Sequence, residues 1–446
     1  MDPPGPGAAP RRAYPRAYIF AGSMHVFTVV SAVITVVALS GYANYKLVRL
    51  PDTVGITAVA LLISVATIAV GQVEPQVTAW GQLAVRGLDF PTLVFHGLLG
   101  LLLFAGSLHV DVAGLSRARG LVILLATVGV AISTVLVGFG FFYAARFLGV
   151  HLSLLESFIF GALISPTDPI AALGLLRKAG VPPSLLTKIT GEALFNDGTG
   201  VVLFVVLLGL AGASHGMSPG ALPPPSPSGV AVMFAQQVVG GAVFGLGVGY
   251  AGILLLRSVD SYTVETLITL AMATGGYAAA ESLKVSAPIA TVVMGLVVGS
   301  GREYAMSELT RERLFMFWEL ADDLLNLVLF GLVGLELTAL AGSFREYLLA
   351  AVAALPIVLL ARFISVGLPI VALRRFQRFE PHTVKLMTWA GLRGALSVAL
   401  ALSLPEGPPK DLIVTATYVI AIFSILIQAT TVQPLARRWC NTQSVK

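Results

Sequence analysis

Runs of apolar residues, separated by short polar segments, follow one another along nearly the whole 446-residue chain. An α-helix needs about 20 mainly apolar residues to cross the ~30 Å hydrocarbon core of a bilayer. The expected fold class is therefore an all-α membrane protein. The pattern predicts thirteen transmembrane helices, near residues 25–48, 53–70, 92–110, 119–148, 152–176, 186–211, 229–256, 262–282, 285–300, 310–340, 345–373, 382–404 and 410–436.

The composition and the chain ends fit this pattern. The sequence is 56% hydrophobic and 11% charged, whereas soluble domains carry about 25% charged residues. Residues 1–23, rich in Pro, Gly and Arg, are expected to be a disordered tail. A transmembrane domain then covers residues 24–438, and residues 439–446 form a short cytoplasmic tail. The apolar run from Val26 exceeds the usual signal-peptide core, so the first helix is expected to be retained.

The charges of the loops predict the orientation. Of the 28 Lys and Arg residues, 18 fall in the alternate loops of one side and eight on the other side. Because cytoplasmic loops are enriched in Lys and Arg, the N-terminus is expected outside and the C-terminus in the cytoplasm. A bacterial inner membrane is the simplest location. The net charge of +5 follows from this topology, so we expect no nucleic-acid partner.

An acidic residue lies between two prolines in the middle of the fifth apolar run. Pro166 and Pro169 cannot both belong to a regular helix, because each lacks a backbone donor and clashes with the preceding turn. The helix is therefore expected to break around Asp168. At membrane depth such a break is tolerated where it lines a cavity or binds a ligand. The alternative is a proline kink in which Asp168 only caps the next half-helix.

A second polar cluster occupies the sixth run, from Glu192 to Asp197. Helical geometry places Glu192 and Asn196 on one face and Asp197 about 100° further round. The helix beside these groups contains three residues without side chains, Gly191, Gly198 and Gly200. Their small size allows the close approach of another backbone or an ion. The alternative is a buried ion-pair network that only holds helices together.

Carboxylate, amide, hydroxyl and backbone oxygens are the ligands that a hard cation such as Na⁺ prefers. The same carboxylates can bind protons, so one site that takes either cation or proton would give exchange. We therefore predict a cation/proton antiporter rather than an enzyme. A monovalent cation channel is the main alternative, and a membrane scaffold or sensor without transport is a third.

Two arginines also fall inside apolar runs, Arg362 and Arg393. An unpaired guanidinium there would be costly, so Glu192 is the expected partner of Arg362. The glycines beside Arg393 predict a second weakened helix, in the twelfth run. With the seventh helix left out, the fifth and twelfth hold equivalent places in two six-helix halves. Inverted repeats whose broken helices cross at mid-membrane predict that placement.

At these residues the chain resembles the NhaP-type sodium/proton antiporters of the cation:proton antiporter-1 family, bacterial relatives of the animal sodium/proton exchangers. The resemblance extends over roughly residues 25–437. It rests on four motifs in order: Pro166-Thr167-Asp168-Pro169; Gly191-Glu192 with Asn196-Asp197-Gly198; Phe317-Trp318-Glu319 with Asn326-Leu327-Val328-Leu329-Phe330 and Gly334; and Gly391-Leu392-Arg393-Gly394-Ala395.

The resemblance implies roles for individual residues. Asp168 and Asp197 would bind Na⁺ and the proton in turn, and Thr167 would add a backbone oxygen. Asn196 would hold the site together beside the Glu192–Arg362 pair. The adjacent Asn196 and Asp197 resemble the electroneutral branch of the superfamily, with one proton exchanged per sodium.

The resemblance also implies an assembly and a mechanism. It implies a homodimer in the lipid bilayer that works by alternating access. A core, mainly the helices near 92–211 and 310–436, would move against a dimerisation part, mainly those near 25–70 and 229–300. The substrates would be Na⁺, Li⁺ or K⁺ and H⁺, and no cofactor is expected.

The chain departs from its relatives at two places. Many relatives have Ser where Ala193 stands, and its hydroxyl can be an ion ligand. A K⁺-preferring K⁺/H⁺ antiporter therefore stays open. Many also carry an acid in the third helix where this chain has Phe104-Ala105-Gly106. Asp322 and Asp323 are expected at a helix start, as a solvated helix beginning or as a funnel for ions.

Overall fold

The computed structural model describes residues 26–87, 89–168, 170–214, 227–340, 344–377 and 379–441, and the named elements among them are all helices. The N-terminal half contains α1 (Val26–Ala43), α2 (Asp52–Gly71), α3 (Pro75–Arg86), α4 (Phe90–Thr92), α5 (Leu99–Leu108), α6 (Val112–Leu124), α7 (Val130–Phe147), α8 (Leu154–Ile164), α9 (Ile170–Lys178) and α10 (Pro183–Ser214). The C-terminal half contains α11 (Pro227–Arg257), α12 (Tyr262–Ala271), α13 (Tyr277–Ser282), α14 (Ala287–Ala305), α15 (Glu308–Leu340), α16 (Phe344–Leu373), α17 (Thr383–Ala390), α18 (Ala395–Leu402), α19 (Pro408–Phe423) and α20 (Ala429–Asn441).

Several of these helices continue into one another through π-helical turns. The turns are η2 (Asn44–Val48), η3 (Leu93–Leu98), η4 (Leu125–Gly129), η5 (Met272–Gly276) and η6 (Ser424–Gln428). Because the helix continues through η4, α6 and α7 form one apolar span of 36 residues, Val112–Phe147. A helical element therefore lies on each of the thirteen predicted segments.

Nine helices of the described chain are long and apolar enough to cross a membrane, and two shorter apolar helices, Leu154–Ile164 and Ala287–Arg302, accompany them. The chain is thus a multi-pass membrane protein. The count of thirteen crossings and the inverted repeats stay predictions. One helix was not predicted: α3 follows α2 directly and packs against both α2 and α15.

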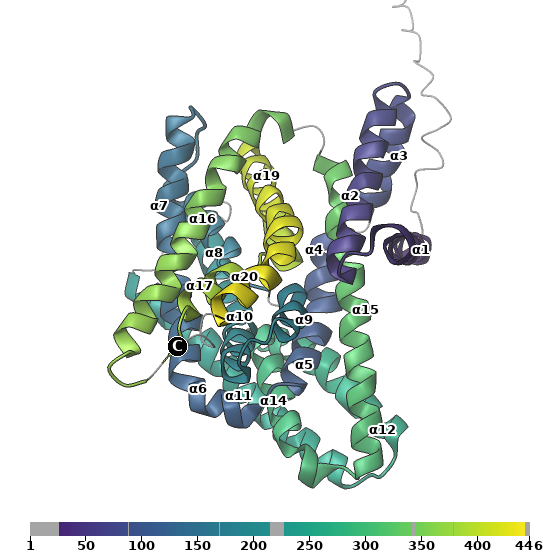
Figure 1. The fold of residues 1–446 in the computed structure, drawn as a ribbon, viewed down its shortest axis with the longest axis vertical. Coiled ribbons are helices and arrows are strands. Elements are labelled where there is room, and N and C mark those ends of the chain that lie inside the picture. The colour runs from purple at the N-terminus through teal and green to yellow at the C-terminus, as the bar shows by residue number, and fades with distance from the viewer. Residues whose placement is uncertain are drawn as a thin grey trace, which may run out of the picture.

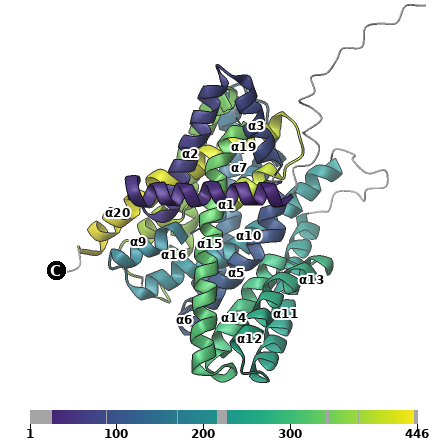
Figure 2. The same ribbon diagram turned by 90° about the vertical axis from the view of Figure 1, so that its right-hand side faces the viewer.

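The first helix does not run alongside its neighbours. Figure 2 shows α1 lying across α15, which is upright in that view. α1 contacts α2 and α15, and side chains such as Ile34, Leu39 and Tyr42 stay exposed. Its apolar length agrees with the predicted segment, but a hydrophobic run sets a helix length rather than a direction.

The centre of the molecule is formed by two interrupted helices. The first runs from α8 to α9, and the second from α17 to α18; α8, α9 and α17 are labelled in Figure 1. α8 begins with a complete capping box, in which Ser153 and Glu156 satisfy each other's backbone N–H groups. From Ile159 to Ile164, α8 is buried. α7, α10 and α18 enclose it, so the break after Ile164 lies inside protein.

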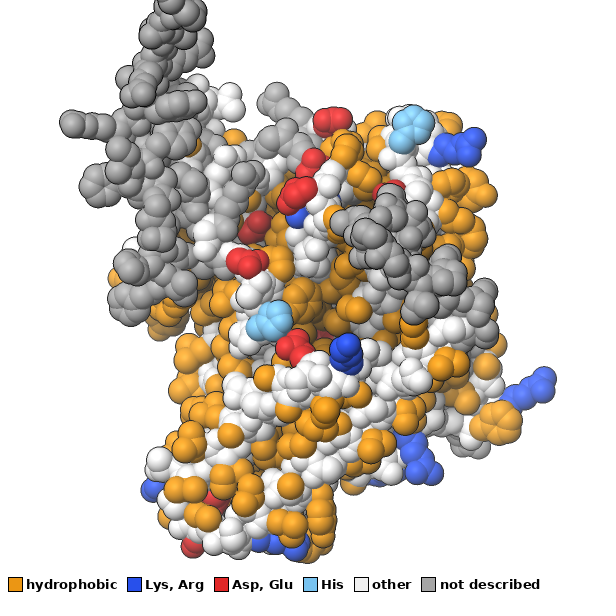
Figure 3. Space-filling view, turned by 180° about the vertical axis from the view of Figure 1, so that it is seen from behind, with side chains coloured by type: hydrophobic (Ala, Val, Ile, Leu, Met, Phe, Trp, Pro, Cys, Tyr) orange, Lys and Arg blue, Asp and Glu red, His pale blue; other side chains and the backbone are white. Residues whose placement is uncertain are grey.

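Apolar side chains cover much of the outer surface. Figure 3 shows hydrophobic side chains spread over the described part of one face, with charged side chains scattered among them. Examples on the outer helices are Tyr250 at 62% and Leu267 at 65% exposure. Apolar patches of this extent are unusual on soluble monomers and are expected on a surface that faces lipid.

Candidate ion-binding site

The two helix breaks meet each other. The N–H of Asp168, after α8, donates to the carbonyl of Leu392, after α17, at 2.9 Å, which forms an isolated antiparallel bridge. Gly394 allows the contact, because a Cβ there would lie 2.6 Å from Oδ2 of Asp168. The predicted break at Asp168 and the predicted weak point at Arg393 are both confirmed, and the two interrupted segments meet at this bridge, which is called the crossing below.

Arg393 satisfies the carbonyl groups that the first break frees. Its Nη1 donates to the carbonyl of Ser165 at 3.0 Å and to that of Pro166 at 2.9 Å. The residue is 2% exposed. The last carbonyls of a helix lack intrahelical partners, and inside a membrane protein they need another donor. Arg393 therefore ties the second broken helix to the first and brings a positive charge to the crossing.

Asn196 links α10 to the same break. Its side-chain oxygen accepts from the N–H of Thr167 at 3.2 Å, and its Nδ2 donates to the Thr167 hydroxyl at 2.8 Å and to Oε1 of Glu192 at 2.7 Å. Thr167, Glu192 and Asn196 are all buried. With its N–H and hydroxyl both engaged by Asn196, the Thr167 peptide is held in one orientation.

Glu192 and Arg362 form the predicted ion pair. Nη1 and Nη2 of Arg362 donate to the two carboxylate oxygens of Glu192, each at 2.7 Å. Nη2 also donates to the carbonyl of Met387 on α17, at 3.3 Å. Such a two-pronged pair is strong and directional. It fixes the relative positions of α10, α16 and α17 around the crossing.

Asp168 and Asp197 differ from this network in their exposure. Both keep partial exposure, whereas Thr167, Glu192 and Asn196 are buried. Asp197 interacts electrostatically with Asp168, Glu192 and Arg393, so the two aspartates share one charged neighbourhood. A carboxylate exposed to lipid would be very costly, so the exposed parts of these two side chains are expected to face water or polar groups.

α10 approaches the first break closely. A Cβ on Gly200 would overlap the ring of Pro166, and a Cβ on Gly198 would lie 2.6 Å from Cγ1 of Ile289 on α14. The sequence suggested that glycines here allow the approach of another backbone or an ion; at Gly200 the group that approaches is the ring of Pro166, at the break itself.

Sequence reasoning missed the polar residues of α7 around the site and misplaced Asp322. The Ser165 hydroxyl donates to Oγ of Ser133 at 2.9 Å and lies 3.3 Å from Oγ1 of Thr134, both on α7. In the sequence, the adjacent polar residues Ser133 and Thr134 inside an apolar run could have indicated this contact. Asp322 interacts electrostatically with Asp168 and accepts from Nδ2 of Asn326 at 3.1 Å. The expected helix start is wrong, because α15 begins at Glu308.

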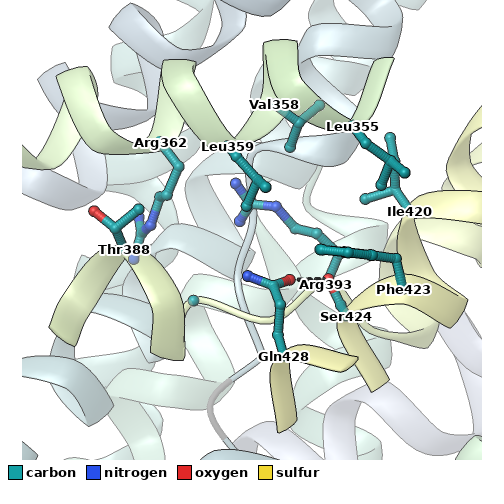
Figure 4. Close-up of a pocket in the computed structure, with 11 residues that line it drawn as sticks. Leu355, Val358, Leu359, Arg362, Thr388, Arg393, Ile420, Phe423, Ser424 and Gln428 are labelled. Atoms are coloured by element: carbon teal, nitrogen blue, oxygen red, sulfur yellow. Dashed lines mark hydrogen bonds between the residues drawn. The ribbon is translucent and has the colours of Figure 1, made fainter. Parts of the chain in front are cut away.

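The two arginines also line a small cavity on the side of α16, α17, α19 and η6 (Figure 4). Its volume is about 10 Å³, close to that of a single water molecule. Ser424 and Gln428 are hydrogen-bonded to each other at its edge. This cavity is too small for a hydrated ion. The carboxylates of Asp168 and Asp197 are therefore the candidate ion ligands.

Comparison of the sequence with known protein families identifies the family of this chain. Residues 33–438 match the pattern of the sodium/hydrogen exchanger family, transmembrane region. The match covers most of the chain and includes every residue of the crossing. The chain belongs to the sodium/hydrogen exchanger family. This is a family of transporters, and the resemblance seen in the four sequence motifs is confirmed.

Individual members of the sodium/hydrogen exchanger family are similar over nearly their full length. The Na⁺/H⁺ antiporter NhaP of Pseudomonas aeruginosa is 43% identical over 415 residues, which are 92% of this chain and 96% of that protein. The Na⁺/H⁺ antiporter NhaH of Halobacillus aidingensis is 32% identical over 419 residues, covering 91% of this chain and 94% of that protein. The solved structure of the sodium proton antiporter MjNhaP1 from Methanocaldococcus jannaschii shares the fold, with a TM-score of 0.64 at 20% identity, and covers 87% of this chain and 98% of that one.

Proposed function

We propose that this protein is a secondary antiporter that exchanges Na⁺ for H⁺ at Asp168 and Asp197. The observation that carries the proposal is the pair of partly exposed aspartates at the crossing of two broken helices, beside a buried network that holds them. Relatives of nearly equal length are named Na⁺/H⁺ antiporters, which supports the same chemistry here.

The ligand set suits a small hard cation. The carboxylates of Asp168 and Asp197 supply charged oxygens, and the Thr167 carbonyl supplies a neutral one. Asn196 engages the N–H and hydroxyl of Thr167, which holds this residue in one orientation at the break. Oxygen ligands of this kind favour Na⁺ over softer metals. When the carboxylates take up a proton instead, they lose the charge that attracts the cation.

The charges at the crossing favour one-for-one exchange. Glu192 and Arg362 neutralise each other through their ion pair. Arg393 offsets one of the two aspartate charges. Among these five residues one negative charge then remains, between Asp168 and Asp197. One bound Na⁺ or one bound proton neutralises this negative charge. The Na⁺-loaded and the proton-loaded carrier therefore have the same net charge.

Coupling follows if the crossing opens to one side of the membrane at a time. In this proposal the core carries Asp168, Asp197 and their network, and it moves against a dimerisation part near residues 25–70 and 229–300. The N-terminus lies outside and the C-terminus in the cytoplasm of a bacterial inner membrane. The carrier is a homodimer in lipid, with inverted six-helix repeats in each subunit.

One observation keeps a K⁺-preferring antiporter as a second candidate. Ala193 is 2% exposed and lies beside Glu192 on α10. Without the hydroxyl that a serine would bring, water has to replace that ligand, which weakens the argument for Na⁺ over K⁺. The ion preference is therefore part of the test.

The test uses everted membrane vesicles with an imposed pH gradient, followed by a fluorescent pH indicator. NaCl, LiCl and KCl are added in turn to the wild type, to Asp197→Asn and to Asp411→Asn, an exposed aspartate at the start of α19. We expect wild type and the control to dissipate the gradient and Asp197→Asn to fail. Normal dissipation by Asp197→Asn would refute the proposed site. Cation flux that leaves the pH gradient unchanged would indicate a channel.

A further inference from the structure

A large groove lies at the C-terminal end of α16, away from the crossing of the broken helices. Its volume is about 830 Å³. It is bounded by the last turns of α16, the connection to α17 and the first turn of α17, at the lower end of α16 in Figure 1. Neither Asp168 nor Asp197 lines it, so it is separate from the proposed ion site.

One wall of the groove is apolar. Phe363, Leu368 and Val371 line it from α16 and are 47%, 54% and 59% exposed. They lie on Glu346–Leu373, one of the candidate membrane spans. Side chains of this type, on a helix of this length, border the hydrocarbon of the bilayer. The apolar wall therefore opens towards acyl chains.

The end of the groove beyond α16 is positively charged. Arg374 and Lys385 line it, and both are exposed. The acidic residue lining it, Glu380, is already engaged by Nζ of Lys188 at 2.9 Å and by the Ser184 hydroxyl at 2.5 Å. None of the ion pairs among the described residues includes Arg374 or Lys385. Two positive charges therefore face the groove without an acidic partner.

We infer that this groove holds an anionic phospholipid, with its phosphate between Arg374 and Lys385 and an acyl chain along Phe363, Leu368 and Val371. Basic side chains directly beyond a membrane helix attract anionic head groups. The leaflet is the one at this end of α16, which is cytoplasmic in the predicted orientation. The apolar wall and the two bases are complementary to one amphipathic molecule, whereas a soluble anion would use the bases alone.

Charge also argues against this chain's own N-terminal segment as the occupant. Its first 25 residues contain three arginines and one aspartate, so a basic segment would meet a basic groove. A bound lipid would instead bridge α16, which carries Arg362, and α17, which carries Met387. The site is thus placed to stabilise the scaffold behind the crossing, whichever ion is exchanged.

The test measures lipid binding to the purified full-length protein in detergent by native mass spectrometry. The probes are phosphatidylglycerol and phosphatidylcholine with identical acyl chains. We expect the wild type to retain phosphatidylglycerol. The double variant Arg374→Gln/Lys385→Gln should lose it. Each base contributes about fivefold, so the double variant should bind about 25-fold more weakly. The control is Arg117→Gln/Arg119→Gln, which removes two exposed bases from α6.

Three results would overturn the inference. The first is equal retention of phosphatidylglycerol by the Arg374/Lys385 variant and the α6 control. The second is displacement of the lipid by inorganic phosphate or glycerol phosphate at millimolar concentration, which would make the groove a site for soluble anions. The third is a change in oligomeric mass without loss of lipid, which would make it a contact between two copies.

Discussion

Replacing Arg362 by methionine would strand a buried carboxylate. Arg362 is 6% exposed and Glu192 is 1% exposed. The substitution removes two charge-assisted hydrogen bonds of 2.7 Å, and Glu192 keeps Nδ2 of Asn196 as a donor at 2.7 Å. Removing one partner of a buried ion pair costs about 3–5 kcal/mol, mostly because the other charge stays buried. Methionine approximately preserves the volume of the side chain, so packing contributes little to this loss.

A double-mutant cycle adds two variants to Arg362→Met. One is Glu192→Gln, and the other combines both changes. Without either charge, the buried site holds a neutral amide that can still accept from Asn196. The double variant should therefore be less destabilised than Arg362→Met alone, with a coupling energy of about 2 kcal/mol or more. The control is Lys410→Met, which breaks the Lys410–Glu406 pair of 2.8 Å, where Glu406 is 89% exposed. A surface pair of that kind contributes about 0–1 kcal/mol.

The free energy of unfolding is measured by titrating the purified proteins from mild detergent into SDS, with helical circular dichroism as the signal. The expected order of stability is wild type, then the double variant, then Arg362→Met. Additive effects of Arg362→Met and Glu192→Gln would refute the reasoning, because two independent residues do not rescue each other.

Two further predictions concern the packing and the pH response. Gly394→Ala should push a methyl group against Asp168 and lower the rate of exchange in vesicles severalfold. The control is Gly367→Ala, whose Cβ would lie 3.7 Å from Val384 and which should leave exchange unchanged. Equal exchange rates in the two variants would contradict this role of Gly394. Burial by itself raises the pKa of Glu380, but hydrogen bonds from Lys188 and Ser184 outweigh it and lower the pKa below its usual value. A lowered carboxyl pKa stabilises the fold above the ordinary pKa, and the gain disappears as pH falls through the lowered value. Thermal unfolding curves of wild type and Glu380→Gln should therefore differ at neutral pH and converge in acid; a constant difference would disprove the link.

Local chemistry allowed the sequence to predict the main parts of the site. Two prolines beside Asp168 exclude a regular helix whatever the surroundings, so the first break was predictable. A buried arginine needs a partner, and Glu192 was an available acid on an apolar helix. The sequence could not show that Arg393 donates to the carbonyls of Ser165 and Pro166, because that contact joins segments more than 200 residues apart.

Tertiary placement explains what was missed. Asp322 comes near Asp168 because of the path of α15, which the predicted segment 310–340 could not show. α3 is short and mixed in polarity, so its segment gave no clear membrane signal. The direction of α1 across α15 depends on packing rather than on its own residues. Whether Asp168 and Asp197 bind the transported ions stays a prediction.

The most direct test of the central claim is proton release on cation binding. Purified protein in a weakly buffered detergent solution is titrated with NaCl at several pH values, and released protons are counted against bound Na⁺. If cation and proton compete for Asp168 and Asp197, about one proton should be released for each Na⁺ bound at pH values where the site is protonated, and Asp197→Asn should release none. Na⁺ binding without proton release, or unchanged release from Asp197→Asn, would contradict the account.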